Sequence, residues 1–258
     1  MDRTFSELED LDRDLPPSIK ILPAANLIKI GGQSIMDRGR AAVYPLLDEI
    51  VALKEAGHQL LIFAGGGTRA RHMYSLALDL DLPTGALAAL GAATARQNGL
   101  MLQMLLAKHG AAYLWPDDFE KLPLYFKLGC LPIMSGMPPF EYYEKLPETG
   151  RIPPHRTDTG MYLAAEYLGA KNVIFVKDED GLYTGDPKKD PEARFLPKIK
   201  VAELLAMDLP DLGIERALIH YMPRAQHVRQ VQIINGLKPG LLTRAMNGEH
   251  VGTIITVD

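Results

Sequence analysis

Short apolar runs that alternate with helical patterns limit the folds open to this chain. Four runs have the length and residue types of buried strands: "NLIKI" (26–30), "QLLIFA" (59–64), "LPIMSG" (131–136) and "NVIFV" (172–176). Apolar residues at helical spacing predict helices between them, over about 39–56, 68–80, 91–108 and 157–168. Strands that alternate with helices form largely parallel sheets covered on both faces. We therefore expect an α/β fold, a three-layer α/β/α sandwich with a mainly parallel central sheet.

The last third of the chain continues this alternation, whereas the first twenty residues do not. Further elements are expected as follows: helices over about 201–206, 216–229 and 240–246, and strands over 231–235 and 252–257. Residues 1–20 are charged and end in the pair Pro16-Pro17. We expect them to form an N-terminal arm outside the core, either disordered or docked on a neighbouring subunit. Residues 21–258 are long enough for one large α/β domain.

Composition narrows the function classes. Apolar residues make up 47% of the 258 residues, so a substantial core can form, and the net charge is −4. That charge argues against bulk attraction to nucleic acid or to an anionic membrane, although a local cationic pocket stays possible. Cys130 is the single cysteine, which excludes an intrachain disulfide and a thiolate zinc site. Without an apolar leader or a long apolar run, we expect a soluble cytoplasmic protein.

Three strand ends carry glycine-containing turns. They read "KIGGQS", "FAGGGTRAR" and "KDEDGLYTGDP". Glycine lets backbone N–H groups approach a phosphate closely, and a helix N-terminus adds a favourable dipole. Neither a P-loop motif nor G-x-G-x-x-G occurs, so a P-loop enzyme is excluded and a dinucleotide fold is unsupported. The turns are consistent with a phosphate site at the carboxyl ends of the strands, or with a purely conformational role.

Two charged residues favour the phosphate interpretation. Lys29 lies inside the apolar strand, one residue before the first glycine turn. Either it belongs to an edge strand and reaches water, or it meets an anion, because an unpaired buried charge is costly. Asp158, in "RTDTG", is either a helix N-cap or a carboxylate that orients Lys29 beside a Mg²⁺–phosphate centre.

These motifs, in this order, resemble the amino acid kinase superfamily. "KIGG", "GGGTRAR", "TDTG", "DGLYTGDPKKDPEAR" and the closing "NGLKPG…GEHVGTII" all match it. The last two of these are especially similar to bacterial UMP kinases. The resemblance covers about residues 26–257 and implies a single sandwich domain that binds ATP with Mg²⁺. It implies that Lys29 and Asp158 are the catalytic pair. It also implies contacts to the nucleotide from a larger set: Gly31, Gly32, Gly65, Gly66, Gly67, Asp178, Asp180, Gly181, Tyr183, Asp186 and Pro187.

The departures from UMP kinases fall mostly on the side of the phosphoryl acceptor. "GGGTRARHMYS" stands where those enzymes usually have "GGGN…RG", and Arg96 occupies a helix that there carries an acid. The loop before "TDTG" is also longer. Asp178 is the exception, because it replaces a lysine on the ATP side. We therefore expect that the acceptor has changed while the ATP side has been kept.

Within the superfamily, the chain is similar to the subunits of the molybdenum storage protein family. "IKIGGQSIMDRGRAAVYPLLDEIV", "ARQNGLML", "IPPHRTDTG" and "AQHVRQVQIINGLKPG" carry this resemblance, which is stronger to the β-type than to the α-type subunit. It implies a hexameric cage, built with a homologous α-type subunit or from this chain alone. It also implies that ATP hydrolysis accompanies uptake of molybdate or tungstate as polynuclear oxide (polyoxometalate) clusters.

Two features of the sequence differ from the α-type subunit. Lys177 precedes the acidic stretch, where the α-type subunit has a carboxylate, and a lysine repels Mg²⁺ unless its ammonium binds phosphate directly. This chain is then a weak or silent ATPase beside a partner. The segment "FEYYE" (140–144) stands where the α-type subunit is rich in histidine. Its oxygens are poor ligands for an anionic oxide, so cluster binding there is doubtful.

The histidines and nearby arginines leave two interpretations open. His155, in "PPHRTDTG", is the best candidate to contact a molybdate or tungstate oxide, since charged residues flank it, and the alternative is an ordinary loop histidine. Arg69, Arg71 and His72 follow the triple glycine and either line an anion path or form a solvated or subunit-contact face.

Three functional hypotheses follow. The first is an ATP-binding molybdenum or tungsten storage subunit. The second is a nucleoside monophosphate (UMP-like) kinase that transfers the γ-phosphate of ATP to a small acceptor. The third is an assembly subunit without catalysis. Replacement of Lys29 separates them, because only the first two predict a loss of ATP turnover.

Overall fold

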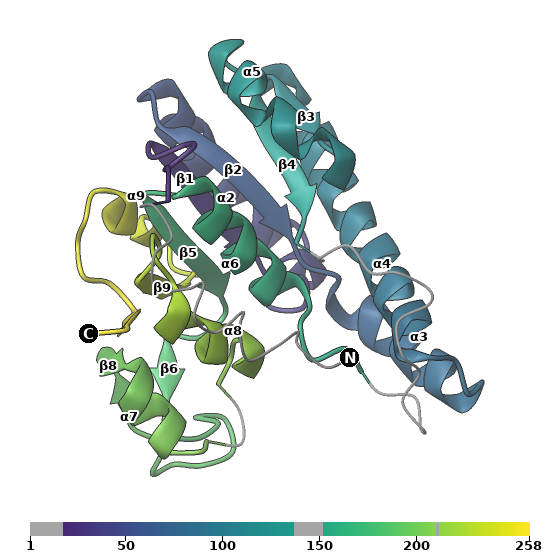
Figure 1. Cartoon of the computed structure of the whole chain (residues 1–258), viewed down its shortest axis with the longest axis vertical. Helices are drawn as coiled ribbons and strands as arrows, with labels where there is room; N and C mark the ends of the chain where they lie inside the picture. The colour runs from purple at the N-terminus through teal and green to yellow at the C-terminus, as the bar shows by residue number, and fades with distance from the viewer. Residues whose placement is uncertain (1–17, 137–151, 210–211) are drawn as a thin grey trace, which may run out of the picture.

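The computed structural model describes residues 18–136, 152–209 and 212–258. Within these residues a central sheet has the strand order β3-β4-β2-β1-β5-β9-β10-β8, and β6 pairs with β7 in a separate ribbon (Figure 1). The strands are β1 (Ala25–Ile30), β2 (Gln59–Ala64), β3 (Ala111–Tyr113), β4 (Leu131–Ser135), β5 (Asn172–Lys177), β6 (Leu182–Tyr183), β7 (Phe195–Leu196), β8 (Lys198–Lys200), β9 (Gln230–Asn235) and β10 (Thr253–Thr256). The α-helices are α2 (Arg40–Glu55), α3 (Gly67–Asp79), α4 (Thr84–Leu105), α5 (Leu122–Lys127), α6 (Thr157–Leu168), α7 (Val201–Ala206), α8 (Arg216–Tyr221) and α9 (Leu241–Met246).

The sheet is parallel apart from one pairing. From β3 through β4, β2, β1 and β5 to β9, every pair of neighbouring strands is parallel. β10 is antiparallel to β9 and parallel to β8. The carboxyl ends of β1, β2 and β5 therefore meet at one edge. Ligands bind at this edge in open α/β sheets. The three glycine-containing turns begin there.

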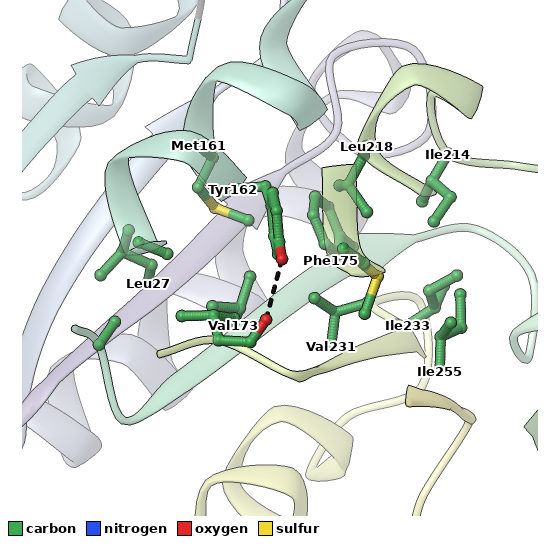
Figure 2. Close-up of a cluster of buried hydrophobic side chains, with 14 of the residues drawn as sticks. Leu27, Met161, Tyr162, Val173, Phe175, Ile214, Leu218, Val231, Ile233 and Ile255 are labelled. Carbon is green, nitrogen blue, oxygen red and sulfur yellow. Dashed lines mark hydrogen bonds between the residues drawn. The ribbon is translucent and has the colours of Figure 1, made fainter. Parts of the chain in front are cut away.

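Alternate side chains of each strand supply two separate cores. On one face, Leu27 of β1 and Phe175 of β5 pack with Met161 and Tyr162 of α6, which lies in front of the sheet in Figure 1. Figure 2 shows this cluster, in which the buried Tyr162 hydroxyl donates a hydrogen bond of 2.9 Å to the Val228 carbonyl. The other face packs against α2 and α9. Helices thus cover both faces, and the expected three-layer sandwich is confirmed.

Several expected elements differ from the structure. The helix expected from about residue 91 begins at Thr84, because the Ala- and Leu-rich stretch after Pro83 continues the helix towards its N-terminus. The helix expected over 216–229 ends as α8 at Tyr221, followed by a 3-10 turn that contains Pro223. The expected pattern missed β3, β6, β7, β8 and α5, each of six residues or fewer. Such short segments carry little periodicity.

Helices α3 and α4 form a hairpin that extends beyond the sheet. The contact between the two helices requires a small residue. The two helices lie side by side in Figure 1 and share a small apolar cluster around Tyr74 and Leu87. A Cβ at Gly91 would lie 2.7 Å from Cζ of the Tyr74 ring. Glycine at 91 therefore lets the helices approach closely.

The start of the described chain lies against the domain. Residues 1–17 of the expected arm, like the segment "FEYYE", lie outside the described residues. The Ser18 hydroxyl is 2.6 Å from Nε2 of His227, and the Leu22 amide donates to the Leu168 carbonyl. No helix in the described part of the chain is both long and apolar enough to cross a membrane.

Candidate functional site

A cavity of about 540 Å³ opens at the carboxyl ends of β1, β2 and β5. Most residues that the sequence assigned to the site line it: Lys29, Gly31, Gly32, Gly65, Gly66, Gly67, Asp158, Asp178, Gly181, Tyr183, Asp186 and Pro187. Two do not. Asp180 turns towards the end of β9, where it accepts hydrogen bonds from Lys238 (2.6 Å) and Asn235 (2.9 Å). His155 is half-buried and lies outside the cavity lining.

Two lysines and one aspartate form the floor of the cavity. Lys29 is 2% exposed and belongs to β1, a central strand, so the edge-strand interpretation is wrong. Its Nζ lies 2.5 Å from Oδ1 of Asp158. Lys177, the last residue of β5, places its Nζ 3.0 Å from Oδ2 of the same carboxylate. Both oxygens of Asp158 therefore accept from an ammonium group, and the centre as a whole carries one excess positive charge.

The charges of this centre are set by burial and by each other. Burial lowers the pKa of Lys29, and the neighbouring Asp158 offsets that effect only in part. Burial alone would raise the pKa of Asp158, but the ammonium groups of Lys177 and Lys29 outweigh it and hold that pKa well below its usual range. Asp158 is therefore an anion at neutral pH that holds two cations in place.

Glu215 holds the N-terminus of α6, a role that the sequence interpretation had left open for Asp158. The Glu215 carboxylate accepts hydrogen bonds from the amides of Arg156 (2.7 Å), Asp158 (3.0 Å) and Thr159 (3.1 Å). It also accepts one from the Thr159 hydroxyl, at 2.7 Å. A remote carboxylate at a helix N-terminus satisfies orphan amides and complements the dipole. Asp158 is not the N-cap, and its side chain is thereby left for the two lysines.

Sequence reasoning missed Glu215 because no local pattern marks it. It follows "DLGI", 57 residues after Asp158, and precedes the short helix α8. Its side chain is 6% exposed. Only its burial and its partners identify it, and both come from the tertiary structure.

The first two glycine turns touch each other, and Gly32 lies at their contact. A Cβ on Gly32 would stand 2.5 Å from Cα of Gly67 and 2.8 Å from the carbonyl oxygen of Gly65. Gly31 and Gly65 donate their amides to the carbonyls of Val176 and Ile30, so these two glycines line the cavity without offering an amide to a ligand. Among the described residues the Gly32 amide has no acceptor.

Gly32→Ala is expected to force these two turns apart. The obstructing atoms are backbone and cannot rotate away, so we expect a loss of about 1–3 kcal/mol in the free energy of unfolding. Nucleotide affinity should fall about tenfold or more, because a loss of about 1.4 kcal/mol in binding free energy lowers affinity tenfold. Urea unfolding and calorimetric titration measure the two effects. Gly185→Ala is the control for stability, because its Cβ would meet side-chain atoms of Asp190, the nearest at 3.0 Å, and of Ala193 at 3.8 Å, and no backbone atom. Equal losses of stability in both variants would contradict this explanation.

The acidic residues that follow β5 already form ion pairs with basic side chains of the same chain. Asp178 accepts from Arg38 at 2.5 Å and from Lys188 at 3.4 Å. Lys188 also contacts Glu179 at 2.5 Å. Burial would raise the pKa of Asp178, but the hydrogen bond from Arg38 and the charge of Lys188 lower it overall. These acids and their basic partners form a polar rim at the edge of the cavity, and each acid is already paired with a basic side chain.

Tyr183 and its surroundings form an apolar side of the same rim. The Tyr183 ring packs on Phe195 of β7, with ring centroids 5.4 Å apart. Gly181 has a φ of +154°, and a Cβ there would lie 2.9 Å from the Thr253 amide, so the turn needs glycine. Asp186 pairs with Lys189 at 2.9 Å and accepts from the Lys188 amide. An aromatic face beside paired acids suits a nucleoside.

The opposite end of the cavity carries arginine. Arg71 and Arg156 line it with Tyr74 and Gly91. Arg69 instead donates to the Asn98 side chain, whose amide donates to the Gly65 carbonyl at 2.5 Å. Arg96 stacks on the ring of Trp115, 4.8 Å from its centroid, and does not line the cavity. Of the three residues expected to line an anion path, Arg69, Arg71 and His72, Arg71 is therefore the one that lines the cavity.

The N-terminus of α3 is also partly occupied by a side chain. Asp37 accepts a hydrogen bond of 2.6 Å from the Thr68 amide. The first turn of this helix thus offers a ligand fewer free amides than the glycine pattern alone suggests.

The carboxylates of the cavity do not fit a protein-held Mg²⁺. Mg²⁺ requires near-octahedral oxygen ligands. Both oxygens of Asp158 accept from lysines, and Asp178 is paired with Arg38 and Lys188. Among the described residues, no group of three His, Cys, Asp or Glu side chains is placed to hold a metal ion. The expected role of Asp158 beside a metal is therefore not supported by its surroundings.

Comparison with known proteins identifies the family. The model of the amino acid kinase family matches residues 25–235. The chain belongs to the amino acid kinase family. Membership of this family, together with the relatives below, implies nucleotide binding. The resemblance seen in the motifs is thereby confirmed.

Relatives within the amino acid kinase family separate into two groups. The chain is 54% identical to molybdenum storage protein subunit beta of Azotobacter vinelandii, over 92% of this chain and 87% of that protein. It is thus a homologue of that subunit. It is 26% identical to the uridylate kinase of Metallosphaera sedula, over 89% of this chain and 97% of the enzyme.

Solved structures agree on the fold. The UMP kinase of Bacillus anthracis superposes with a TM-score of 0.71 at 20% identity, covering 92% of this chain and 97% of the enzyme. The uridylate kinase of Archaeoglobus fulgidus has the same TM-score at 24% identity, over 90% of this chain and all of that chain. The amino acid kinase fold is therefore confirmed.

Proposed function

We propose that this chain is a β-type subunit of a molybdenum or tungsten storage assembly that binds ATP. In this proposal, molybdate or tungstate is taken up as polynuclear oxide clusters inside a hexameric cage, with ATP hydrolysis. The observation that carries the storage part is the 54% identity to a molybdenum storage protein subunit beta over 92% of the chain. We propose a homologous α-type subunit as the partner, with residues 21–258 as the domain and residues 1–20 as an arm.

The chemistry of the cavity supports the nucleotide part of this proposal. Lys29 and Lys177 present ammonium groups at the strand ends, and Asp158 orients both. In a buried site such preorganised charges stabilise phosphate more strongly than in water. The Tyr183 side of the cavity would receive the adenosine, and the Arg71 end would receive the second anion. Any Mg²⁺ would arrive on the phosphate oxygens of ATP, since the carboxylates of the cavity are already paired.

The experiment that tests storage uses the purified full-length protein in its native assembly. It is incubated with Mg-ATP and molybdate, or with Mg-ATP and UMP, then desalted, and the metal and nucleotides are measured. Retention of molybdenum in many-fold excess over chains, and only with ATP, supports storage. Conversion of UMP to UDP without retained molybdenum would instead identify a nucleotide kinase, the activity named for the uridylate kinase relatives.

Lys29→Ala is expected to abolish most of this ATP-dependent retention. Removal of one charge contact to a transferring phosphate lowers rates by about 10²-fold or more. The control is Lys171→Ala, an exposed lysine just before β5, at the opposite end of the strand from Lys177. Absence of ATP turnover already in the wild type, with an unchanged assembly in the Lys29 variant, would indicate the third hypothesis, an assembly subunit without catalysis.

A further inference from the structure

Asn98 of α4 is a buried polar residue that joins the second glycine turn (residues 65–67) to helix α3. It is 0% exposed and does not line the cavity. Its Nδ2 donates a hydrogen bond of 2.5 Å to the Gly65 carbonyl, and its Oδ1 accepts from the Arg69 guanidinium. A carbonyl only accepts and a guanidinium only donates, so a side-chain amide satisfies both partners in one orientation. A carboxylate of the same shape would satisfy Arg69 alone.

Gly65 is held from two sides, and Asn98 supplies one of them. The Gly65 amide donates to the Ile30 carbonyl at 3.1 Å, whereas its carbonyl accepts from Asn98. A Cβ at Gly65 would lie 3.3 Å from Nζ of Lys29, so this residue stands directly beside the phosphate centre. A peptide group is planar and rigid. The hydrogen bond from Asn98 therefore sets the plane of the whole peptide between Gly65 and Gly66.

That peptide also contains the amide of Gly66. The described peptide bonds are trans, and the N–H and C=O of a trans peptide point in opposite directions. The Gly66 amide thus points away from Asn98, has no acceptor among the described residues, and belongs to a residue that lines the cavity. Gly66 is also tightly enclosed, since a Cβ there would lie 2.7 Å from Cβ of Ala70 and 2.8 Å from Oγ1 of Thr94. Its amide is a fixed donor for an anion in the cavity.

From this arrangement we propose that Asn98 is a positioning residue of the nucleotide site. It holds the peptide between Gly65 and Gly66 so that the Gly66 amide donates to a phosphate oxygen of the bound nucleotide. Asn98 acts through the backbone and does not touch the ligand. Arg69, which does not line the cavity, fixes the other end of the Asn98 side chain. The inference rests on the nucleotide part of the proposed function.

Asn98→Asp tests this inference, because the carboxylate keeps the contact with Arg69 and loses the donor to Gly65. Calorimetric titration with a non-hydrolysable ATP analogue and Mg²⁺ measures the affinity of the full-length protein in its native assembly. We expect the affinity to fall about tenfold or more, the effect of a weakened hydrogen bond to a charged group.

Asn26→Asp is the matched control at the opposite end of the sheet. Asn26 is 2% exposed and lies near the amino end of β1, away from the cavity lining. Its Nδ2 donates to the Gln59 carbonyl at 3.1 Å, and its Oδ1 accepts from Asn172 at 2.8 Å. The same substitution therefore places the same charge against the same kinds of group. Its affinity for the analogue should stay within about threefold of the wild type.

A second pair of variants and a second measurement separate positioning from stability. Asn98→Ala and Asn26→Ala remove the amide without introducing a buried charge, and the same order of affinities is expected. Hydrogen exchange, followed by mass spectrometry at saturating analogue, reports on the amides of residues 65–67. The analogue should slow this exchange about tenfold or more in the wild type and less than about threefold in Asn98→Asp, because the Gly66 amide is then no longer held towards the phosphate.

The possible results distinguish this inference from the proposed function. Equal affinities of the Asn98 and Asn26 variants, or full protection of residues 65–67 in Asn98→Asp, overturn the positioning role and leave nucleotide binding intact. Absence of analogue binding to the wild type overturns the nucleotide part of the proposed function as well. Molybdenum retention is measured separately and does not decide between them.

Discussion

Asp158→Ala is expected to destabilise the protein by about 3–5 kcal/mol, the cost of leaving a buried charge without its partner. The substitution leaves Lys29, which is 2% exposed, without the carboxylate at 2.5 Å. It also leaves Lys177 without the acceptor at 3.0 Å, so that two like charges face each other across a void. Urea unfolding measures the loss. Nucleotide affinity should fall too, because neither lysine is then held in position.

The pH dependence of this effect has a definite sign. The pKa of Asp158 is held below its usual range in the folded protein, so the folded state binds fewer protons at this group. Its contribution to stability is complete above the unfolded pKa of about 4 and is lost as the pH falls towards the folded pKa. The stability difference between wild type and Asp158→Asn should be constant between about pH 5 and 7 and shrink below about pH 4.

A rim acid supplies the control for Asp158. Asp178 is paired with Arg38, whose side chain is 43% exposed, and exposed pairs contribute only about 0–1 kcal/mol. Asp178→Asn should therefore change stability little. A loss below about 1 kcal/mol for Asp158→Ala would mean that the Asp158 centre is open to water and that the buried pairing described above is wrong.

Glu215→Ala is expected to cost about 3–5 kcal/mol in the free energy of unfolding, because four donors lose one buried anionic acceptor. Three of these donors are amides at the N-terminus of α6, the helix that carries Asp158. The helix start should loosen, and the pairs of Asp158 with Lys29 and Lys177 should loosen with it. Nucleotide affinity is therefore expected to fall together with stability. Glu215→Gln keeps one acceptor oxygen and should lose less of both.

A second remote carboxylate provides a matched control for Glu215. Glu49 accepts from the amides of Gly240 and Thr243 and from the Thr243 hydroxyl, at the start of α9. Glu49→Ala should lower stability without a change in nucleotide affinity, because α9 does not line the cavity. Affinity is compared without denaturant, at a temperature where both variants are folded. If both then lower nucleotide affinity equally, Glu215 has no special positioning role.

The sequence by itself determined the layers of the fold and much of the site. The strands around residues 26–30, 59–64 and 172–176 are continuous apolar runs, and burial on both faces of a parallel sheet requires that pattern. Lys29 inside such a run and glycine directly after it are anomalies that a local pattern makes visible. Since the strands are parallel, their carboxyl ends meet, and the cavity follows from that geometry.

Tertiary structure alone decided how the charges of this site are paired. That Lys177 reaches the same carboxylate as Lys29, that Glu215 caps α6, and that Asp180 turns to Lys238 all depend on segments far apart in the chain. No periodicity records such contacts, because they arise only when helices and strands pack. For the same reason, the sequence showed acids suited to Mg²⁺, whereas the folded chain has already neutralised them with its own lysines and arginines.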